Sequence, residues 1–211
     1  MMQIPDQIIE KANKEIEGCD VEGFVLGGGS SEADIVIVGE APGEHEAVKG
    51  VPFIGRAGDE LDKQFNYIGI KREEVYITSA VRSRPYKWVK TTKKGSGGSR
   101  KANRKPNKKE IWAHAPILDY QLNTIAPKLI IALGGVALER LLGQGYKITE
   151  VLGEVIESSI LEVQGEGYGW SEKRYAIFPL YHPAAVFYNP RIKEDIYQSL
   201  DHLKEYMDQL N

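Results

Sequence analysis

The sequence predicts an α/β fold of three layers, in which helices cover both faces of a central, mainly parallel sheet of four strands. Short apolar runs rich in β-branched residues are typical of strands buried on both faces, and they lie at Asp34–Gly39, Val75–Val81, Lys128–Leu133 and Tyr175–Pro179. Between these runs, apolar residues recur at helical spacing. Strands that alternate with helices pair in parallel and carry the helices on both faces.

The expected helices are defined by their apolar stripes. Near the N-terminus, Pro5 suits a first helical position and Gly18 ends the stripe. The stripes are Ile8, Ala12 and Ile16; Leu61, Phe65 and Ile68; Ile111, Ala115, Leu118, Leu122 and Ile125; and Ile192, Ile196, Leu200, Leu203 and Leu210. Residues 149–163 are expected to form an irregular strand or hairpin. A length of 211 residues suits one α/β domain, or at most two small ones, and we expect residues 1–211 to form one.

Composition excludes several classes of protein. With 42% hydrophobic and 27% charged residues, the chain is neither mostly disordered nor collagen-like. Its single cysteine, Cys19, cannot form an internal disulfide or supply a four-thiolate cluster. The longest nearly apolar run, Leu129–Leu138, has about half of the roughly 20 residues that a membrane span needs, and the N-terminus lacks the pattern of a signal peptide. We therefore expect a cytoplasmic protein with no membrane partner and no structural metal. We also expect a monomer, although composition does not determine the oligomeric state.

The charge of the chain is unevenly distributed. Residues 84–109 hold eleven Lys or Arg and no Asp or Glu, although the net charge of the whole chain is −3. The rest of the chain holds the other 16 of the 27 basic residues against 30 acidic ones, a net charge of −14. Such a block marks either a loop that binds a polyanion or a solvated, disordered insertion. We expect a basic loop insertion here, with its low-complexity part at Thr91–Lys109.

Unusual residues follow three of the expected strands, at the edge where parallel sheets bind ligands. The turn Gly39-Glu-Ala-Pro-Gly43 leaves backbone N–H groups pointing outward, where an anion or a carbonyl oxygen can sit. Glu40 should face the cleft, and its carboxylate can orient or activate a water. The alternative is an ordinary turn with a surface glutamate.

Two further residues stand out by their setting. Phe53 lies outside any periodic pattern, in a Gly- and Pro-rich loop that can present its ring to a planar group; the alternative is an ordinary core Phe under a loop. His182, held between a strand end and Pro183, can donate a hydrogen bond to a developing oxyanion, or it can be structural. The chain has no Ser-His-Asp spacing, Walker loop, GxGxxG or metal-ligand spacing.

Together these motifs resemble the uracil-DNA glycosylase superfamily, most closely its family-four branch, first associated with thermophiles. The segments that carry the resemblance are Gly39–Gly58, Val75–Pro85, Pro127–Gly134 and His182–Pro190. The resemblance implies a DNA repair enzyme, a hydrolase of the base excision type. It would cleave the N-glycosidic bond of uracil, or a related deaminated base, in single- or double-stranded DNA and leave an abasic site. No lysine nucleophile is needed, so strand cleavage is not expected.

The same resemblance implies roles for individual residues. Glu40 would position the water or stabilise the cationic sugar, and His182 would hydrogen-bond the base oxygen that gains negative charge. These two are the expected catalytic residues. Phe53 would stack on the flipped base, and backbone groups would line the base pocket. The expected substrate-binding residues are Gly39, Ala41, Pro42, Gly43, Phe53 and Ser79.

Two departures from the family pattern change these expectations. The family-four branch normally binds a four-iron–four-sulfur cluster through four cysteines, but only Cys19 is present, and Ser83 stands where the resemblance places another cysteine. No cluster, and no other cofactor, is therefore expected. The family usually has Asn on the second strand to read uracil, where this chain has Ser79, whose hydroxyl offers one donor on a shorter arm. The alternatives are therefore a catalytically weak or inactive DNA-binding relative, or a glycosylase whose base specificity has shifted, for example to hypoxanthine.

The basic insertion is the expected DNA contact. Unstacking a base from a duplex costs about a few kcal/mol, which phosphate contacts and a stacking partner must offset. The expected DNA-binding residues are Arg84, Lys87, Lys93, Lys94, Arg100, Lys101, Arg104 and Lys105, with Tyr86 and Trp88 as candidates for contacts to bases or sugars. One subgroup of the superfamily captures the sugar covalently through a histidine in a similar insertion. Residues 100–106 contain no histidine, so covalent capture is not expected.

Overall fold

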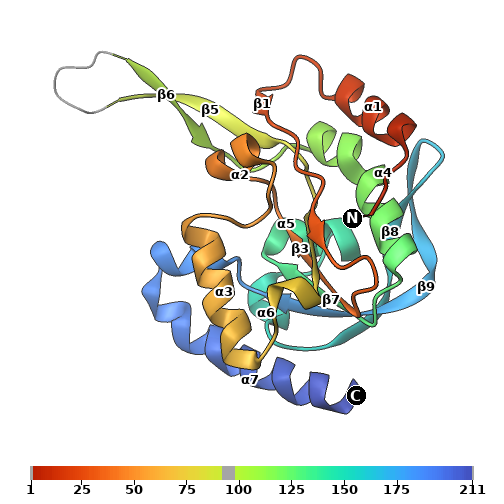
Figure 1. Ribbon diagram of the computed structural model, residues 1–211, viewed down its shortest axis with the longest axis vertical. Coiled ribbons are helices and arrows are strands. Elements are labelled where there is room, and N and C mark those ends of the chain that lie inside the picture. Colours follow the sequence, from red (N-terminus) through yellow and green to blue (C-terminus); the bar gives the residue numbers. More distant parts are fainter. Residues whose placement is uncertain (1, 92–97, 211) are drawn as a thin grey trace.

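The centre of the structure is a six-stranded sheet with the strand order β2-β4-β3-β7-β9-β8 (Figure 1). This computed structural model describes residues 2–91 and 98–210. The strands are β2 (Gly28–Gly29), β3 (Ile35–Gly39), β4 (Tyr76–Ser79), β7 (Leu129–Leu133), β8 (Ile156–Gln164) and β9 (Gly167–Leu180). The inner strands β4, β3, β7 and β9 are parallel, whereas β2 and β8 pair antiparallel at the two edges.

The mainly parallel α/β sheet is confirmed, and its parallel centre consists of the expected strands. The expected number of strands was too low, because two edge strands complete the sheet. Strand β2 consists of two glycines and has no apolar pattern to reveal it. Strand β8 overlaps the segment 149–163, for which a strand or hairpin was expected. Strand β9 begins well before Tyr175, because its mostly exposed first half pairs only with β8.

Helices cover both faces of the sheet, as expected (Figure 1). They are α1 (Asp6–Glu15), α3 (Arg56–Ile68), α4 (Lys108–Ile125), α5 (Gly135–Leu142) and α7 (Lys193–Leu210). Successive side chains of a strand point to opposite faces. Thus Ile37 of β3 packs in an apolar cluster with Leu61 of α3 and Leu200 of α7, whereas its neighbour Val36 packs in another with Leu118 of α4.

Short elements lie between these main ones. They are α2 (Glu44–Lys49), α6 (Ile148–Val151) and the 3-10 turns η1 (Arg72–Glu74), η2 (Pro183–Phe187) and η3 (Pro190–Ile192). Because α2 follows β3 and η2 follows β9, both begin at the carboxyl edge of the parallel strands. Across the described ranges, the helices are too short or too polar for any of them to cross a membrane.

The basic segment departs from the expected loop. Strands β5 (Arg84–Lys90) and β6 (Ser99–Asn103) form an antiparallel hairpin, and β1 (Val21–Glu22) pairs with β5 to complete a second, three-stranded sheet. The hairpin projects away from the main sheet (Figure 1). The sequence did not predict these strands, because the many charged residues obscure the alternation of apolar and polar side chains around Tyr86 and Trp88. The segment also ends earlier than expected, since α4 begins at Lys108. Lys93 and Lys94 lie outside the described residues.

Candidate active site

The unusual residues at the strand ends meet at the carboxyl edge of the sheet. Gly39 at the end of β3 lies directly opposite Ser79 at the end of β4. His182 follows β9, whose last residue Leu180 pairs with the last residue of β7. The ring centroids of Phe53 and His182 lie 5.7 Å apart, with 30° between the ring planes. Segments far apart in the sequence therefore form one cluster.

Gly39 has no side chain because the ring of Phe53 occupies its place. A Cβ at this position would lie 2.7 Å from two carbons of that ring. Phe53 belongs to the apolar cluster between the sheet and α3, and it also contacts His182 through its ring. The ring therefore belongs to the core, as one reading of the sequence expected, and it also lies beside His182; its role in binding a base stays a prediction.

The loop that carries Phe53 is held in a strained conformation. Its φ angle of 50° lies in the left-handed region, which costs a bulky residue about 1–3 kcal/mol. Arg72 offsets this strain, because its guanidinium donates to the carbonyl oxygens of Pro52 and Phe53 and pairs with Asp62 at 2.8 Å. Sequence patterns did not reveal Arg72, since it lies about twenty residues away from the loop that it holds.

His182 has a defined protonation state and tautomer. Its Nδ1 accepts a hydrogen bond from the backbone N–H of Ala184 at 3.2 Å, so this nitrogen carries no proton in the neutral ring. Burial lowers the pKa of His182 to about 4, so the ring is neutral near pH 7. The proton therefore sits on Nε2. The backbone of Gly134 packs closely against His182. A Cβ at Gly134, whose φ angle is 88°, would lie 3.2 Å from the Cβ of His182.

Glu40 is half-buried and its backbone is fixed by the end of β4. The N–H of Val81 donates to its carbonyl oxygen at 3.0 Å. Burial raises the pKa of the Glu40 carboxyl, and the nearby positive charge of Lys105 counteracts this. Among the described residues, the carboxylate has no hydrogen-bond or ion-pair partner. It is thus available to a water or a developing positive charge.

The turn after β3 offers fewer N–H groups than the sequence suggested. Pro42 has none, and the N–H of Gly43 donates to the carboxylate of Glu46 in the first turn of α2. Burial raises the pKa of Glu46, and hydrogen bonds from the backbone of Gly43 and of the Phe53 loop oppose this. Beyond β3, Glu40 and Ala41 therefore carry the other N–H groups of the turn. Glu46 was missed because the sequence signal of a capping box needs Ser or Thr three residues before the glutamate, and Gly43 has no side chain.

Ser79 is buried and its single proton is already used. Its Oγ donates to the carbonyl oxygen of Val81 at 2.8 Å, and Nη1 of Arg82 approaches the same Oγ at 3.5 Å. Arg82 is fully buried and also donates to Thr78 and Gln121, while burial lowers its pKa to about 9. Arg82 remains charged near pH 7. Only a lone pair of Ser79 is left for a ligand.

The expected DNA-binding residues separate into two groups. Lys87, Arg100 and Lys105 are exposed, whereas Arg84 is buried and Arg104 is partly buried, with its charge paired to buried Glu110. Arg84 is 3% exposed and pairs with Glu22 and Glu44, which leaves its charge little access to a phosphate. These acidic partners come from distant parts of the chain, so the sequence did not reveal them. The corrected set of surface cations excludes Arg84 and Arg104.

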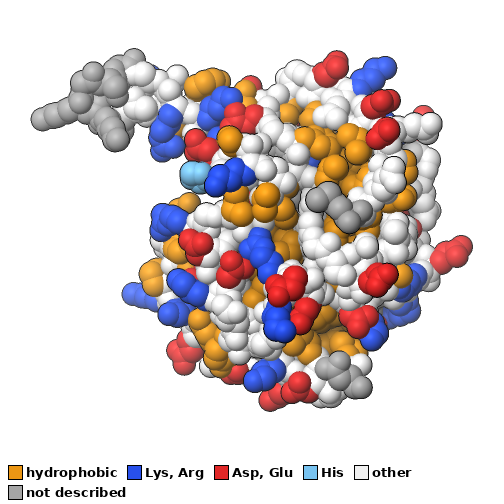
Figure 2. Space-filling model, viewed as in Figure 1, with side chains coloured by type: hydrophobic (Ala, Val, Ile, Leu, Met, Phe, Trp, Pro, Cys, Tyr) orange, Lys and Arg blue, Asp and Glu red, His pale blue; other side chains and the backbone are white. Residues whose placement is uncertain are grey.

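Aromatic side chains accompany the cations of the hairpin. Trp88 is 59% exposed, and Nζ of Lys101 lies 4.2 Å from the ring centroid of Tyr86 and 5.7 Å from that of Trp88. Lys101 also pairs with Glu22. A groove of about 560 Å³ separates the hairpin from α2, and Trp88, Arg100 and Lys101 line it. Figure 2 shows Lys and Arg side chains gathered beside the base of the hairpin.

The residues present do not fit a four-cysteine metal cluster. The chain has one cysteine. Ser83 is fully buried, and its Oγ has no hydrogen-bond partner within the described residues. Nor do three or more potential metal-binding side chains gather anywhere in the described ranges. The donors needed for such a cluster are therefore missing.

A family model and several similar proteins relate this chain to uracil DNA glycosylases. The family model described as the uracil DNA glycosylase superfamily matches residues 26–211. A type-4 uracil-DNA glycosylase of Sulfurisphaera tokodaii is 34% identical, and the match covers 93% of this chain and 84% of the relative. Another of Saccharolobus solfataricus is 37% identical, with 86% and 74% covered. A third, of Pyrobaculum aerophilum, is 32% identical over 91% of each chain.

Proposed function

The chain belongs to the uracil DNA glycosylase superfamily, and from this premise we propose that it removes uracil from DNA by hydrolysing the N-glycosidic bond. The product would be an abasic site, without strand cleavage. The observation that carries the proposal is the meeting of three separate turns at the carboxyl edge of the sheet, where the ring of Phe53 packs against Gly39, the residue before Glu40, and lies beside His182. The expectation of a cytoplasmic monomer stays a prediction.

His182 is proposed to stabilise the departing base. When the bond between C1′ of the sugar and N1 of uracil breaks, its electron pair leaves with the base and negative charge grows on a base oxygen. The Nε2–H of His182 can donate to this oxygen, because the Ala184 N–H holds the other nitrogen as an acceptor. A neutral donor of fixed tautomer needs no reorganisation during the reaction, and one such donor is typically worth about 3–4 kcal/mol.

Glu40 is proposed to act on the sugar side. As the base leaves, positive charge develops on the sugar, and a carboxylate without a partner in the protein can stabilise it and orient the attacking water. The water oxygen bonds to C1′, the water gives a proton to the Glu40 carboxylate, and the departing uracil anion finally takes up a proton, so that one water is consumed for each bond broken. This role requires an ionised carboxylate, so the charge of Lys105, which lowers the pKa of Glu40 against the effect of burial, supports it.

Ser79 bears on which base is accepted. Because its proton is donated to Val81, its Oγ presents only a lone pair. Uracil has a proton on N3 that such an oxygen can accept, whereas N3 of cytosine has none. The same lone pair also suits N1–H of hypoxanthine, which keeps hypoxanthine as a second candidate substrate. A Ser79→Asn variant that excises uracil faster than the wild type would show that the serine hydroxyl recognises uracil less well than an asparagine amide does.

The hairpin is proposed to bind DNA through the cations that remain on the surface. Lys87, Arg100, Lys101 and Lys105 are candidates for phosphate contacts, and exposed Trp88 is a candidate for stacking on a base or sugar. Lys93 and Lys94 stay candidates on the strength of the sequence alone.

One assay tests the proposal against its alternatives. Single- and double-stranded oligonucleotides that carry uracil, hypoxanthine or xanthine are incubated with the protein and then treated with alkali, which cleaves at abasic sites. Scission at uracil that is lost in His182→Ala supports the proposal. Scission at hypoxanthine alone would establish the shifted specificity. Binding without scission would instead identify an inactive DNA-binding relative.

A further inference from the structure

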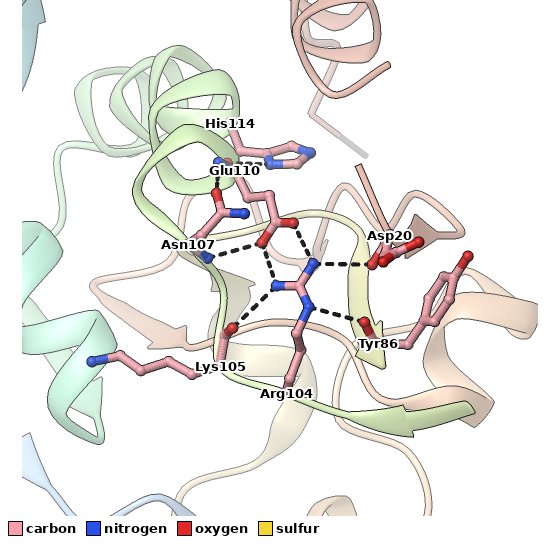
Figure 3. Close-up of polar contacts among 7 residues, drawn as sticks. All are labelled: Asp20, Tyr86, Arg104, Lys105, Asn107, Glu110 and His114. Carbon is pink, nitrogen blue, oxygen red and sulfur yellow. Dashed lines mark hydrogen bonds and ion pairs between the residues drawn. The ribbon is translucent and has the colours of Figure 1, made fainter. Parts of the chain in front are cut away.

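Arg104 uses every N–H group of its guanidinium inside the protein (Figure 3). Its Nε donates to the carbonyl of Tyr86 at 2.9 Å. Its two terminal nitrogens donate to the carbonyls of Lys105 and Asp20, each at 3.2 Å, and to the two carboxylate oxygens of Glu110 at 2.9 and 2.6 Å. We refer to Arg104, Glu110 and these three carbonyls as the Arg104 clasp. It joins β5, the segment before β1, the end of the hairpin and the start of α4.

Glu110 is anchored as firmly as its partner. Its side chain is fully buried, and its carboxylate also accepts the backbone N–H of Asn107, while the Asn107 side chain accepts the N–H of Glu110. Burial raises the pKa of Glu110, but the hydrogen bonds from Arg104 and Asn107 outweigh this and hold the pKa below its usual value. His114, one turn later, donates from Nδ1 to the Glu110 carbonyl at 2.7 Å, and burial lowers its pKa to about 4. Glu110 is therefore ionised near pH 7, and with Arg104 it forms an ion pair.

The clasp ties the base of the hairpin to segments that lie far apart in the sequence. The carbonyls of Asp20, before β1, and of Tyr86, in β5, accept hydrogen bonds from the same guanidinium that pairs with Glu110 of α4. We infer that the ion pair between Arg104 and Glu110 is a positioning device that braces these chain segments and fixes the basic hairpin on α4.

This positioning serves the proposed function, on which the inference rests. Lys105 follows Arg104 directly, and its charge acts on Glu40. Asn103, which precedes Arg104, accepts a hydrogen bond from Nε of Arg84 at 2.7 Å. The clasp thereby fixes the backbone next to Lys105 and, above all, the direction in which the hairpin projects. Because every N–H group of its guanidinium is already hydrogen-bonded within the protein, Arg104 acts through these neighbours and does not contact a DNA phosphate itself.

The substitution Glu110→Gln separates positioning from simple electrostatics, since the two give opposite signs. Removing a negative charge next to a basic DNA-binding arm strengthens DNA binding if charge alone matters. If the clasp positions the hairpin, the same substitution weakens binding, because the amide N–H groups face a guanidinium that has lost its anion. Asp34→Asn is the matched control, since it removes the same charge from an exposed ion pair with Lys128.

The experiment measures three properties of the full chain. Hydrogen exchange of peptides from β5 and β6 should become about tenfold faster in Glu110→Gln, because a charge-assisted hydrogen bond is lost. Affinity for a uracil-containing oligonucleotide, measured by fluorescence anisotropy, should fall about tenfold, with the salt dependence unchanged because no phosphate contact is removed. Excision at saturating enzyme should change far less. Asp34→Asn should match the wild type in all three.

A second variant distinguishes loss of the clasp from unfolding caused by an unpaired buried charge. Arg104→Gln combined with Glu110→Gln leaves no buried charge unpaired, so the core should stay folded while the hairpin exchanges as fast as in the single variant. Unchanged exchange in β5 and β6, or tighter DNA binding by Glu110→Gln, would overturn the inference. Failure of the proposed function looks different: the wild type itself would leave uracil in place, or loosening the hairpin would not alter DNA affinity.

Discussion

The close approach of Phe53 to Gly39 makes the substitution Gly39→Ala a direct probe of the site. The added Cβ would lie 2.7 Å from two ring carbons. Since carbon atoms pack at about 3.5 Å or more, the ring must move by about 0.8 Å. Arg72 holds the carbonyl of Phe53 at 2.7 Å, so the backbone cannot follow and the ring must turn away from its place beside His182.

Two costs follow from this displacement. Overpacking of a core typically costs about 1–3 kcal/mol of stability. Loss of one aromatic–base stack costs about 1–3 kcal/mol of binding, which corresponds to a loss in kcat/KM for uracil excision of about 5- to 150-fold. The stability cost would appear as a lower urea midpoint, and the catalytic cost as slower release of uracil from an oligonucleotide.

Controls separate the two costs. Gly28→Ala adds the same methyl group to another strand of the sheet, where nothing lies within 4 Å, and it should leave both stability and excision close to wild type. Adding Phe53→Leu to Gly39→Ala makes room for the methyl group, so the stability should recover while excision stays low. If Gly39→Ala excises uracil as fast as the wild type does, the ring of Phe53 does not act on the substrate.

Three further outcomes are expected. His182→Ala should lower single-turnover excision by about two to three orders of magnitude, as expected for one lost oxyanion donor, with little change in DNA affinity. The free energy of unfolding should fall as pH drops from about 6.5 towards 4, because buried His114, with a folded pKa of about 4, takes up its proton more readily in the unfolded chain. This contribution amounts to about 3 kcal/mol. Urea titrations at several pH values should therefore show a shallower pH dependence in His114→Gln. Lys87→Gln with Arg100→Gln should weaken DNA binding and reduce the slope of log affinity against log salt by about 2, and an unchanged slope would remove the hairpin from the DNA interface.

Local pattern was enough for the central sheet and for the residues at its edge. β-branched runs such as Ile35–Val38 mark a buried strand because few other structures bury every side chain in succession. Glycine and proline after such a strand indicate a turn, which placed Glu40 and His182 at the carboxyl edge. Where the apolar pattern was absent, as in the two glycines of β2, or hidden by charge, as in the hairpin, the strands were missed.

What the sequence by itself determined is the positions of the parallel strands along the chain, the turns that follow them and the residue types that those turns present. Only the tertiary structure decided which polar groups remain free. Gly43 gives its N–H to Glu46, Ser79 gives its proton to Val81, and Arg104 gives all of its N–H groups to the protein. The physical reason is that a hydrogen bond or an ion pair depends on distance in space. The partner of Ser79 lies two residues away, whereas Arg104 and Arg84 bind groups up to 84 residues away, which no local pattern connects.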